Sequence, residues 1–133
     1  MIGIDTNVLL RHTLNDDRRQ SPVATALLTD DGRLAEPALI NPVALLEFVW
    51  TLARRETFAK PDILALLDAL TSSQRIAFTD EGAVIAAIES WRHGKADFPD
   101  YLIGHLNRQA GATTTVTFDA AAASEPGFTR LEA

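Results

Sequence analysis

The chain has 133 residues, enough for one domain with a real hydrophobic core, and we expect residues 1–133 to form a single domain. Apolar residues make up 47% and charged residues 23%, which is a globular composition, and the absence of cysteine excludes disulfides, zinc thiolate sites and a cysteine nucleophile. The net charge of −6 argues against a nucleic-acid binder of the basic-patch type. It still permits a nuclease that holds metal ions with several carboxylates, because those acids lower the net charge.

The chain shows no targeting or membrane-spanning pattern. Its N-terminus lacks the basic and then apolar order of a signal peptide, and no run of about 18 uncharged apolar residues occurs. We therefore expect a soluble protein of the cytoplasm.

Short apolar or β-branched runs alternate with longer helical segments. The runs predict strands at 2–4, 37–40, 75–78 and 113–117 and a marginal strand at 128–131. Helices are expected at about 8–14, 22–28, 42–55, 60–70, 82–93 and 99–110, with a helical turn at 120–123. Ser21 should cap the second helix and Asp31-Gly32 should end it, and Asn41 should cap the third. This alternation predicts an α/β domain with a central parallel sheet of four to five strands and helices on both faces.

Two acids directly follow predicted strands. Asp5 comes after the opening run, which we expect to be a fully buried strand, and Phe118-Asp119 repeats this arrangement after the strand at 113–117. Ligands bind at the carboxyl ends of parallel strands, so acids there are well placed for chemistry. The alternative is that Asp5 only caps the next helix, because Asp is favoured at helix starts.

A third acid lies inside an otherwise apolar helix. Glu47 shares a stripe with Val43, Leu46 and Trp50 on the helix at 42–55, which we expect in the interior. A buried carboxylate is costly unless compensated, so Glu47 should have a metal ion, another cation or a raised pKa. The structural alternative is a salt bridge to an arginine such as Arg11 or Arg54. Both tryptophans are expected in the core and not as nucleotide-stacking platforms.

Asp97 and Asp100 stand at the start of the helix at 99–110, where the helix dipole alone favours acids. Together with Asp5, Glu47 and Asp119, Asp100 could converge at one sheet edge. Such a group of carboxylates needs cations, and oxygen-only ligation suits Mg²⁺ or Mn²⁺. Two such ions can activate a water and stabilise the leaving oxygen in phosphodiester cleavage.

Four ordered sequence blocks resemble PIN domains, and most closely the VapC-type toxins of prokaryotic toxin–antitoxin pairs. The blocks are Asp5-Thr6-Asn7-Val8-Leu9, the stretch from Pro42 to Trp50, the stretch from Ala96 to Ile103, and Thr117-Phe118-Asp119. The resemblance implies a three-layer PIN-like fold and a metal-dependent endoribonuclease. It also implies an RNA substrate, a cognate antitoxin that often inserts a basic side chain into the acidic pocket, and a homodimer.

The resemblance assigns the acidic site to Asp5, Glu47, Asp100 and Asp119, with Mg²⁺ or Mn²⁺ as the cofactor. Asp100 is selected as the third acid because it precedes an aromatic residue and then Leu-Ile. Asp97 is then a helix cap or reaches the metal through water, while Thr6 and Asn7 resemble supporting residues that orient Asp5 or the metal waters. Phosphates of the substrate could be held by Arg11, Arg54, Arg55 and Arg108, although scattered arginines usually form a solvated surface.

Two other readings remain open. A Mg²⁺-dependent phosphotransfer domain would share the acid after the first strand, but no second aspartate stands two residues after Asp5, and the only lysines are Lys60 and Lys95. A non-catalytic module would use the acidic pocket only to receive a basic partner segment. RNA cleavage that needs metal and is lost in Asp5→Asn separates the nuclease from both.

Overall fold

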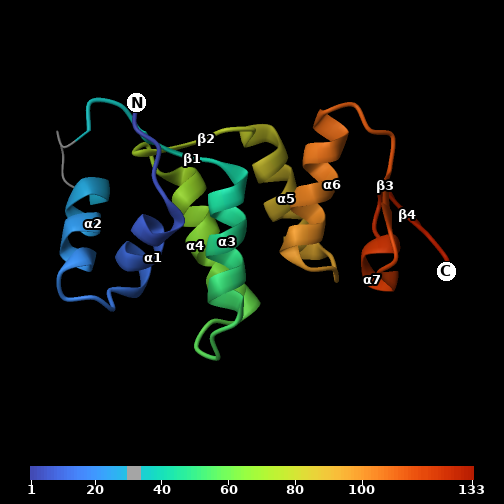
Figure 1. Cartoon of the computed structure of the whole chain (residues 1–133), viewed down its shortest axis with the longest axis horizontal. Helices are drawn as coiled ribbons and strands as arrows, with labels where there is room; N and C mark the ends of the chain where they lie inside the picture. The colour runs from blue at the N-terminus through green and yellow to red at the C-terminus, as the bar shows by residue number, and fades with distance from the viewer. Residues whose placement is uncertain (30–33) are drawn as a thin grey trace. The chain divides into compact units, whose positions relative to one another are not determined.

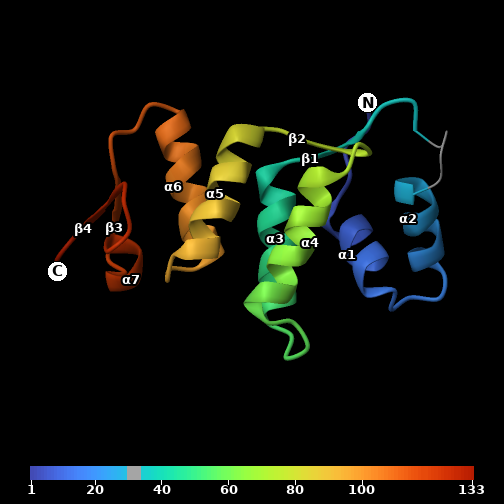
Figure 2. The ribbon, with the colours of Figure 1, turned by 180° about the vertical axis from the view of Figure 1, so that it is seen from behind.

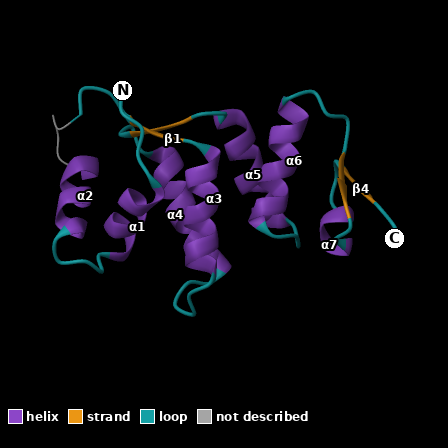
Figure 3. Cartoon of the chain, viewed as in Figure 1, coloured by secondary structure: helices purple, strands orange, loops and turns teal. Residues whose placement is uncertain are grey.

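The computed structural model describes residues 1–29 and 34–133, and within them the chain forms two compact units, residues 1–79 and 80–133. Helices make up most of the described chain, and the strands are short (Figures 1 and 3). The predicted helix end at Asp31-Gly32 lies outside the described residues. None of the helices in these two ranges is long and apolar enough to span a bilayer.

The first unit holds four helices and one parallel strand pair. Its elements are α1 (Thr6–Leu14), α2 (Gln20–Thr29), β1 (Ala38–Ile40), α3 (Pro42–Ala53), α4 (Lys60–Ser72) and β2 (Ile76–Phe78). β1 and β2 pair in parallel, with Ala38 opposite Ile76 and Ile40 opposite Phe78. Helices α3 and α4 lie side by side in both views (Figure 2). The core is formed by buried side chains of α1, β1, α3 and α4, among them Leu9, Ile40, Leu45, Phe48, Leu52, Ile63 and Leu67.

The opening run is extended, but it is not the buried strand that the sequence suggests. Only Gly3 forms a bridge, parallel to Leu39, although the Ile4 amide donates to the Leu39 carbonyl and the Leu39 amide donates to Ile2. Met1 is 69% exposed and Ile2 is 43% exposed. The prediction of full burial was therefore wrong, because the run pairs with β1 without being covered.

Two predicted caps have different outcomes. Asn41 caps α3 as predicted, and its side-chain oxygen accepts from the Ala44 amide at 2.9 Å. Ser21 does not cap α2, which begins at Gln20, because the Asp17 carboxylate instead accepts from the amides of Arg19 and Gln20. The Ser21 hydroxyl accepts from the Asp17 amide and is fully buried.

Helix α3 is not buried all round, as its sequence had suggested. Its neighbours α1 and α4 cover one side, where Leu45, Phe48 and Leu52 are fully buried. Val43 is 65% exposed and Trp50 is 54% exposed. The prediction failed because an apolar residue stays in water when its unit contains no element to cover it.

The second unit consists of a helix pair and a second parallel strand pair. Its elements are α5 (Glu81–His93), α6 (Phe98–Gln109), β3 (Thr115–Thr117), α7 (Ala120–Ala123) and β4 (Phe128–Arg130). Trp91 of α5 packs against Phe98 of α6 with ring centroids 5.4 Å apart, as expected for a core tryptophan. β3 and β4 pair in parallel through the connecting α7, with Thr115 opposite Phe128. The α/β class and the parallel pairing are thus confirmed, and four strands and the Gly3 bridge lie at the five predicted strand positions. Within the described ranges, however, the strands form two separate parallel pairs, one in each unit, and not the single central sheet of four to five strands that the alternation predicted.

Candidate functional site

Asp5 stands where the extended opening run turns into α1. It is the N-cap residue of that helix, and its Oδ1 accepts from the Thr6 amide at 2.7 Å. The prediction that Asp5 caps the next helix is therefore confirmed. Capping occupies only one carboxylate oxygen of Asp5, because Oδ2 makes no hydrogen bond within the described ranges and the residue is exposed.

Asp119 repeats this arrangement in the second unit. It follows β3 and caps α7, and its Oδ1 accepts from the amides of Ala121 at 2.7 Å and Ala122 at 3.2 Å. The predicted repetition of a strand followed by an acid is confirmed. Here too Oδ2 faces no donor in the part of the chain that the structure describes.

Asp100 lies in the first turn of α6 and is partly buried. Burial raises the pKa of its carboxyl group, and the negative charges of Asp119 and Asp97 raise it further. Only a hydrogen bond from the backbone amide of Asp97 to the Asp100 carboxylate acts in the opposite direction. The second unit therefore brings three of the predicted acids close enough to repel one another.

Asp97 occupies the N-cap position of α6 with extended backbone angles, as the capping hypothesis requires. Its side chain, however, accepts no hydrogen bond from the first turn of the helix, and the residue is exposed. The Asp97 carboxylate is therefore placed like a cap without acting as one.

Glu47 does lie on one stripe with Val43 and Trp50, but the stripe is exposed. The expectation of a buried carboxylate that demands compensation was therefore wrong. The alternative salt bridges are absent among the described residues, because Arg11 pairs with Asp16 and Arg54 lies over the ring of Trp50. The guanidinium carbon of Arg54 is 4.3 Å from that ring's centroid, so Trp50 is an exposed cation–π partner and not a core residue.

The two predicted supporting residues differ in burial. Thr6 is only 5% exposed, and its hydroxyl oxygen has no hydrogen-bond partner within the described part of the chain. Asn7 is exposed. A buried hydroxyl without a partner is costly, and that of Thr6 stands next to a candidate metal ligand.

Most of the predicted phosphate-binding arginines have structural partners. Arg11 donates to Gln20 at 2.9 Å and to Asp16 at 3.2 Å, and Arg55 lies 3.9 Å from the same Asp16 carboxylate. Arg54 stacks on Trp50. Arg108, in the last turn of α6, is exposed and makes no ion pair with any described residue.

The predicted site residues divide between the two units. Asp5, Thr6, Asn7 and Glu47 belong to the first, and Asp97, Asp100 and Asp119 to the second. Within the described residues no group of three or more His, Asp or Glu side chains is arranged to hold an ion. The chemistry of the donors fits a hard divalent cation, since carboxylate and hydroxyl oxygens are what Mg²⁺ and Mn²⁺ prefer.

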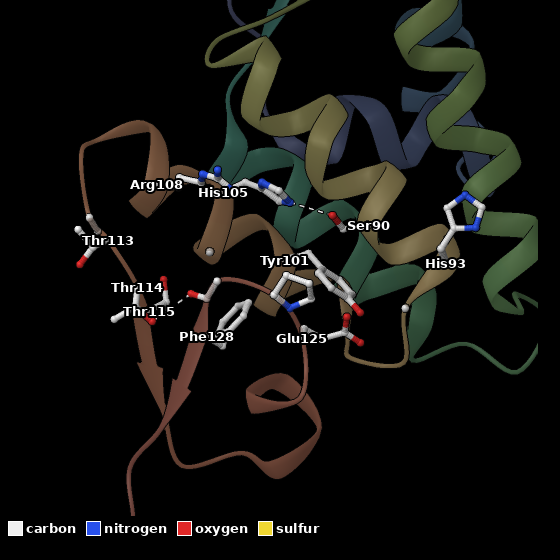
Figure 4. Close-up of a pocket in the computed structure, with 15 residues that line it drawn as sticks. Ser90, His93, Tyr101, His105, Arg108, Thr113, Thr114, Thr115, Glu125 and Phe128 are labelled. Carbon is white, nitrogen blue, oxygen red and sulfur yellow. Dashed lines mark hydrogen bonds between the residues drawn. The ribbon is translucent and has the colours of Figure 1, made fainter.

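A cavity of about 610 Å³ in the second unit brings together residues that sequence reasoning missed, namely Ser90, Tyr101, His105, Glu125 and Phe128 (Figure 4). Among its lining residues only Arg108 had been assigned a role in binding, and the sequence offered no reason to treat His93 or His105 as ligands. The Ser90 hydroxyl and His105 Nε2 are 2.9 Å apart, and the Tyr101 hydroxyl accepts from the Ala96 amide. The available signal was the spacing of Tyr101, His105 and Arg108, which places them on one face of α6.

Comparison with known families gives one match. A family model described as PIN domain matches residues 2–125, which covers all four candidate acids and both supporting residues. No protein with a curated description matches the chain.

Proposed function

Because the chain belongs to the PIN domain family, we propose that it is a metal-dependent endoribonuclease. PIN domains have a three-layer α/β fold and are generally nucleases that depend on divalent metal ions, so a nuclease fold and a hydrolase class hold for this chain at that level. The choice of RNA as substrate and of an internal cut goes further. It is supported by the ordered sequence blocks that resemble VapC-type toxins.

The observation that best supports this function is the mutual repulsion of acids in the second unit. Burial, then the charge of Asp119, then the charge of Asp97 raise the pKa of Asp100, so the ionised form of Asp100 is disfavoured beside these two acids. A divalent cation removes that repulsion and turns the cluster into a favourable site. Structural acids gain nothing from such proximity, whereas metal ligands require it.

We assign the metal ligands to Asp5, Glu47, Asp100 and Asp119, and the ion to Mg²⁺ or Mn²⁺. Asp5 and Asp119 each commit Oδ1 to a helix start, which fixes the carboxylate and leaves Oδ2 for a cation. Bound ions would supply an activated water and stabilise the leaving oxygen of the phosphodiester. Thr6, Asn7 and Asp97 would orient the ligands or the waters around them.

The biological role that we propose is that of the toxin in a toxin–antitoxin pair in the cytoplasm. Its partners would be RNA, a cognate antitoxin that places a basic side chain among the acids, and a second copy of the chain in a homodimer. Support comes from the four blocks that run through the chain in the family's order.

The test is cleavage of labelled total cellular RNA by the purified chain, freed of any partner, with Mg²⁺ or Mn²⁺ and with chelator. Asp5→Asn, Asp100→Asn and Asp119→Asn remove single charges from the site, and Glu132→Gln removes one from the exposed C-terminal end as a matched control. We expect discrete products that need metal and persist in the control. The cleavage rate of each site variant should fall by at least about a hundredfold. Loss of a group that only orients a metal ligand costs up to about that much, and loss of a ligand itself should cost no less.

Other results would replace this function. If the wild type binds metal and is as inert on RNA as the Asn variants, the acidic pocket serves a partner and not a reaction. Turnover of a simple phosphate ester in the absence of RNA cleavage would instead favour the phosphotransfer alternative.

A further inference from the structure

The second unit contains a cavity that the proposed metal chemistry does not use. It lies between α5 and α6 on one side and the segments 112–115 and 125–128 on the other, and its volume of about 610 Å³ is typical of small-molecule sites. None of Asp97, Asp100 and Asp119 lines it. It is thus a candidate binding site separate from the acids, although α6 carries residues of both.

One end of this cavity is positively charged. Arg108 and His105 lie together there, on the side of Thr113, while the side chain of His93 is turned away from them (Figure 4). Burial, then the charge of Arg108, lower the pKa of His105, so the charged form of this ring is disfavoured. Within the described ranges Arg108 makes no ion pair, whereas His93 bonds to Glu89 at 2.9 Å. Arg108 is therefore the cation available to a ligand.

At the opposite end of the cavity lies Glu125, whose carboxylate already accepts hydrogen bonds from the protein. The Glu125 carboxylate accepts from the Lys95 amide at 3.0 Å and from the Tyr101 hydroxyl, and these contacts lower its pKa. A carboxylate held in this way offers little to a metal ion or an ammonium group. The cavity therefore favours a ligand whose charge is negative and lies at the Arg108 end.

Between the two ends the wall is flat and apolar. The half-buried ring of Phe128 lies so close to Gly104 that a Cβ built on this glycine would be 2.8 Å from the ring. Gly127 also lines the cavity, and nothing lies within 4 Å of the position that a Cβ on it would take. An aromatic ring beside this unobstructed part of the wall suits a planar ligand. Every nucleobase has a flat face that can stack on an aromatic side chain.

We propose that this cavity binds a nucleoside monophosphate, either free or as one nucleotide of single-stranded RNA. The phosphate pairs with Arg108 and the Thr113 hydroxyl, and the base stacks on Phe128. The choice of a nucleotide over other planar phosphates rests on the proposed ribonuclease function. The position of the binding site does not, because it follows from the cavity itself.

The test uses the glycines as reporters. The chain has seven, and three of them, Gly94, Gly104 and Gly127, line the cavity. Protein labelled with ¹⁵N at glycine is titrated, with chelator present, with each of the four 5′-ribonucleotides, with a short single-stranded RNA and with inorganic phosphate. We expect nucleotide or RNA to move the signals of these three glycines and to leave that of Gly3 in place. Shifts with mononucleotides identify a free ligand, and shifts with RNA alone identify a substrate subsite.

Variants then locate the contacts. Arg108→Ala should weaken binding about tenfold or more, as expected for loss of a charged hydrogen-bond donor. Phe128→Leu keeps apolar bulk and should weaken binding about fivefold or more through lost stacking. Arg130→Ala removes the same charge from an exposed residue of β4 outside the cavity, and should leave the affinity unchanged. The glycine spectrum itself shows whether each variant remains folded.

Several results would overturn the proposal. These are the absence of any glycine shift with nucleotides and RNA, the same shifts at the same affinity with inorganic phosphate, or an equal loss of affinity in Arg130→Ala. Because the titrations contain chelator, they do not depend on cleavage. A chain that cleaves RNA with metal but shows no cavity shifts refutes this inference alone, and one that shows the shifts but never cleaves RNA refutes the proposed function alone.

Discussion

Asp100 lies close enough to Asp119 for the negative charge of Asp119 to raise the pKa of the Asp100 carboxyl group. After burial, the charge of Asp119 is the largest cause of the raised pKa of Asp100. A carboxyl group whose pKa is higher in the folded state binds its proton more tightly there. This group therefore stabilises the fold at pH values below 3.8, the ordinary pKa of aspartate. The stabilisation is lost as the pH rises through the raised pKa of the folded state.

The first prediction follows from this sign. At neutral pH and with chelator, Asp100→Asn should raise the free energy of unfolding by less than about 1 kcal/mol, because solvent screens a group that is only partly buried. Urea unfolding measures the change, with Glu132→Gln as the control for loss of one charge. The gain should disappear when the pH is lowered below 3.8. A destabilised Asn variant at neutral pH would show that the acids do not repel one another.

The second prediction concerns Thr6, whose buried hydroxyl has no partner within the described residues. Thr6→Val keeps the shape and removes the unsatisfied group, so the metal-free protein should be equally stable or more stable by about 1 kcal/mol. RNA cleavage should nevertheless fall, if the hydroxyl orients the metal ligands or their waters. Thermal unfolding and cleavage are measured on the same preparation. A parallel loss of stability and activity would mean that the hydroxyl only supports the fold.

The third prediction uses the single tyrosine of the chain. Burial, then the hydrogen bond to Glu125, raise the pKa of Tyr101 to about 12. The ultraviolet absorbance of tyrosinate should therefore rise about two pH units later than that of free tyrosine, and Glu125→Gln should bring it earlier. Titration of the folded protein in small pH steps measures this directly. An unchanged midpoint in Glu125→Gln would remove the carboxylate as a cause.

The fourth prediction compares two glycines of one segment. A Cβ at Gly94 would collide with the Tyr101 hydroxyl and lie 2.9 Å from the Ser90 carbonyl oxygen, whereas a Cβ at Gly82 of α5 meets nothing within 4 Å. Gly94→Ala should cost about 1–3 kcal/mol through overpacking, and Gly82→Ala should gain about 0.5–1 kcal/mol of helix stability. Denaturant unfolding of both variants checks the pair. Equal effects would mean that the space around Gly94 relaxes freely.

Local patterns in the sequence predicted most elements, because capping and turn chemistry act over a few residues. Asn41 caps α3 as expected, and Asn15, with a φ of 50°, ends α1 where turn residues cluster. The start of α2 was misplaced because two residues competed for one role. The Asp17 carboxylate accepts from the amides of Arg19 and Gln20, and so takes the capping role that was assigned to Ser21. The local sequence does not indicate which of the two residues caps the helix.

Burial was predicted less well than secondary structure. The apolar surroundings of Glu47 and Trp50 suggested an interior helix, but burial depends on which elements surround it, and that is a tertiary property. The cavity was missed for the same reason. Tyr101 and Phe128 are separated by 27 positions, and only the packing of the β3–β4 pair near α6 brings them to one site. The acids Asp5 and Asp119, in contrast, were found because their local context repeats.

At Asp5 and Asp119, the helix cap depends on a side-chain oxygen and not on the negative charge of the carboxylate. Asp5 and Asp119 each begin a helix through Oδ1, and asparagine begins a helix as well as aspartate does, whereas alanine costs about 1 kcal/mol. A single amide in place of a carboxylate should therefore remove one ligand of the proposed metal site and leave both helix starts in place. Among single-base changes at these codons, those that give asparagine should therefore separate loss of the proposed activity from loss of folding.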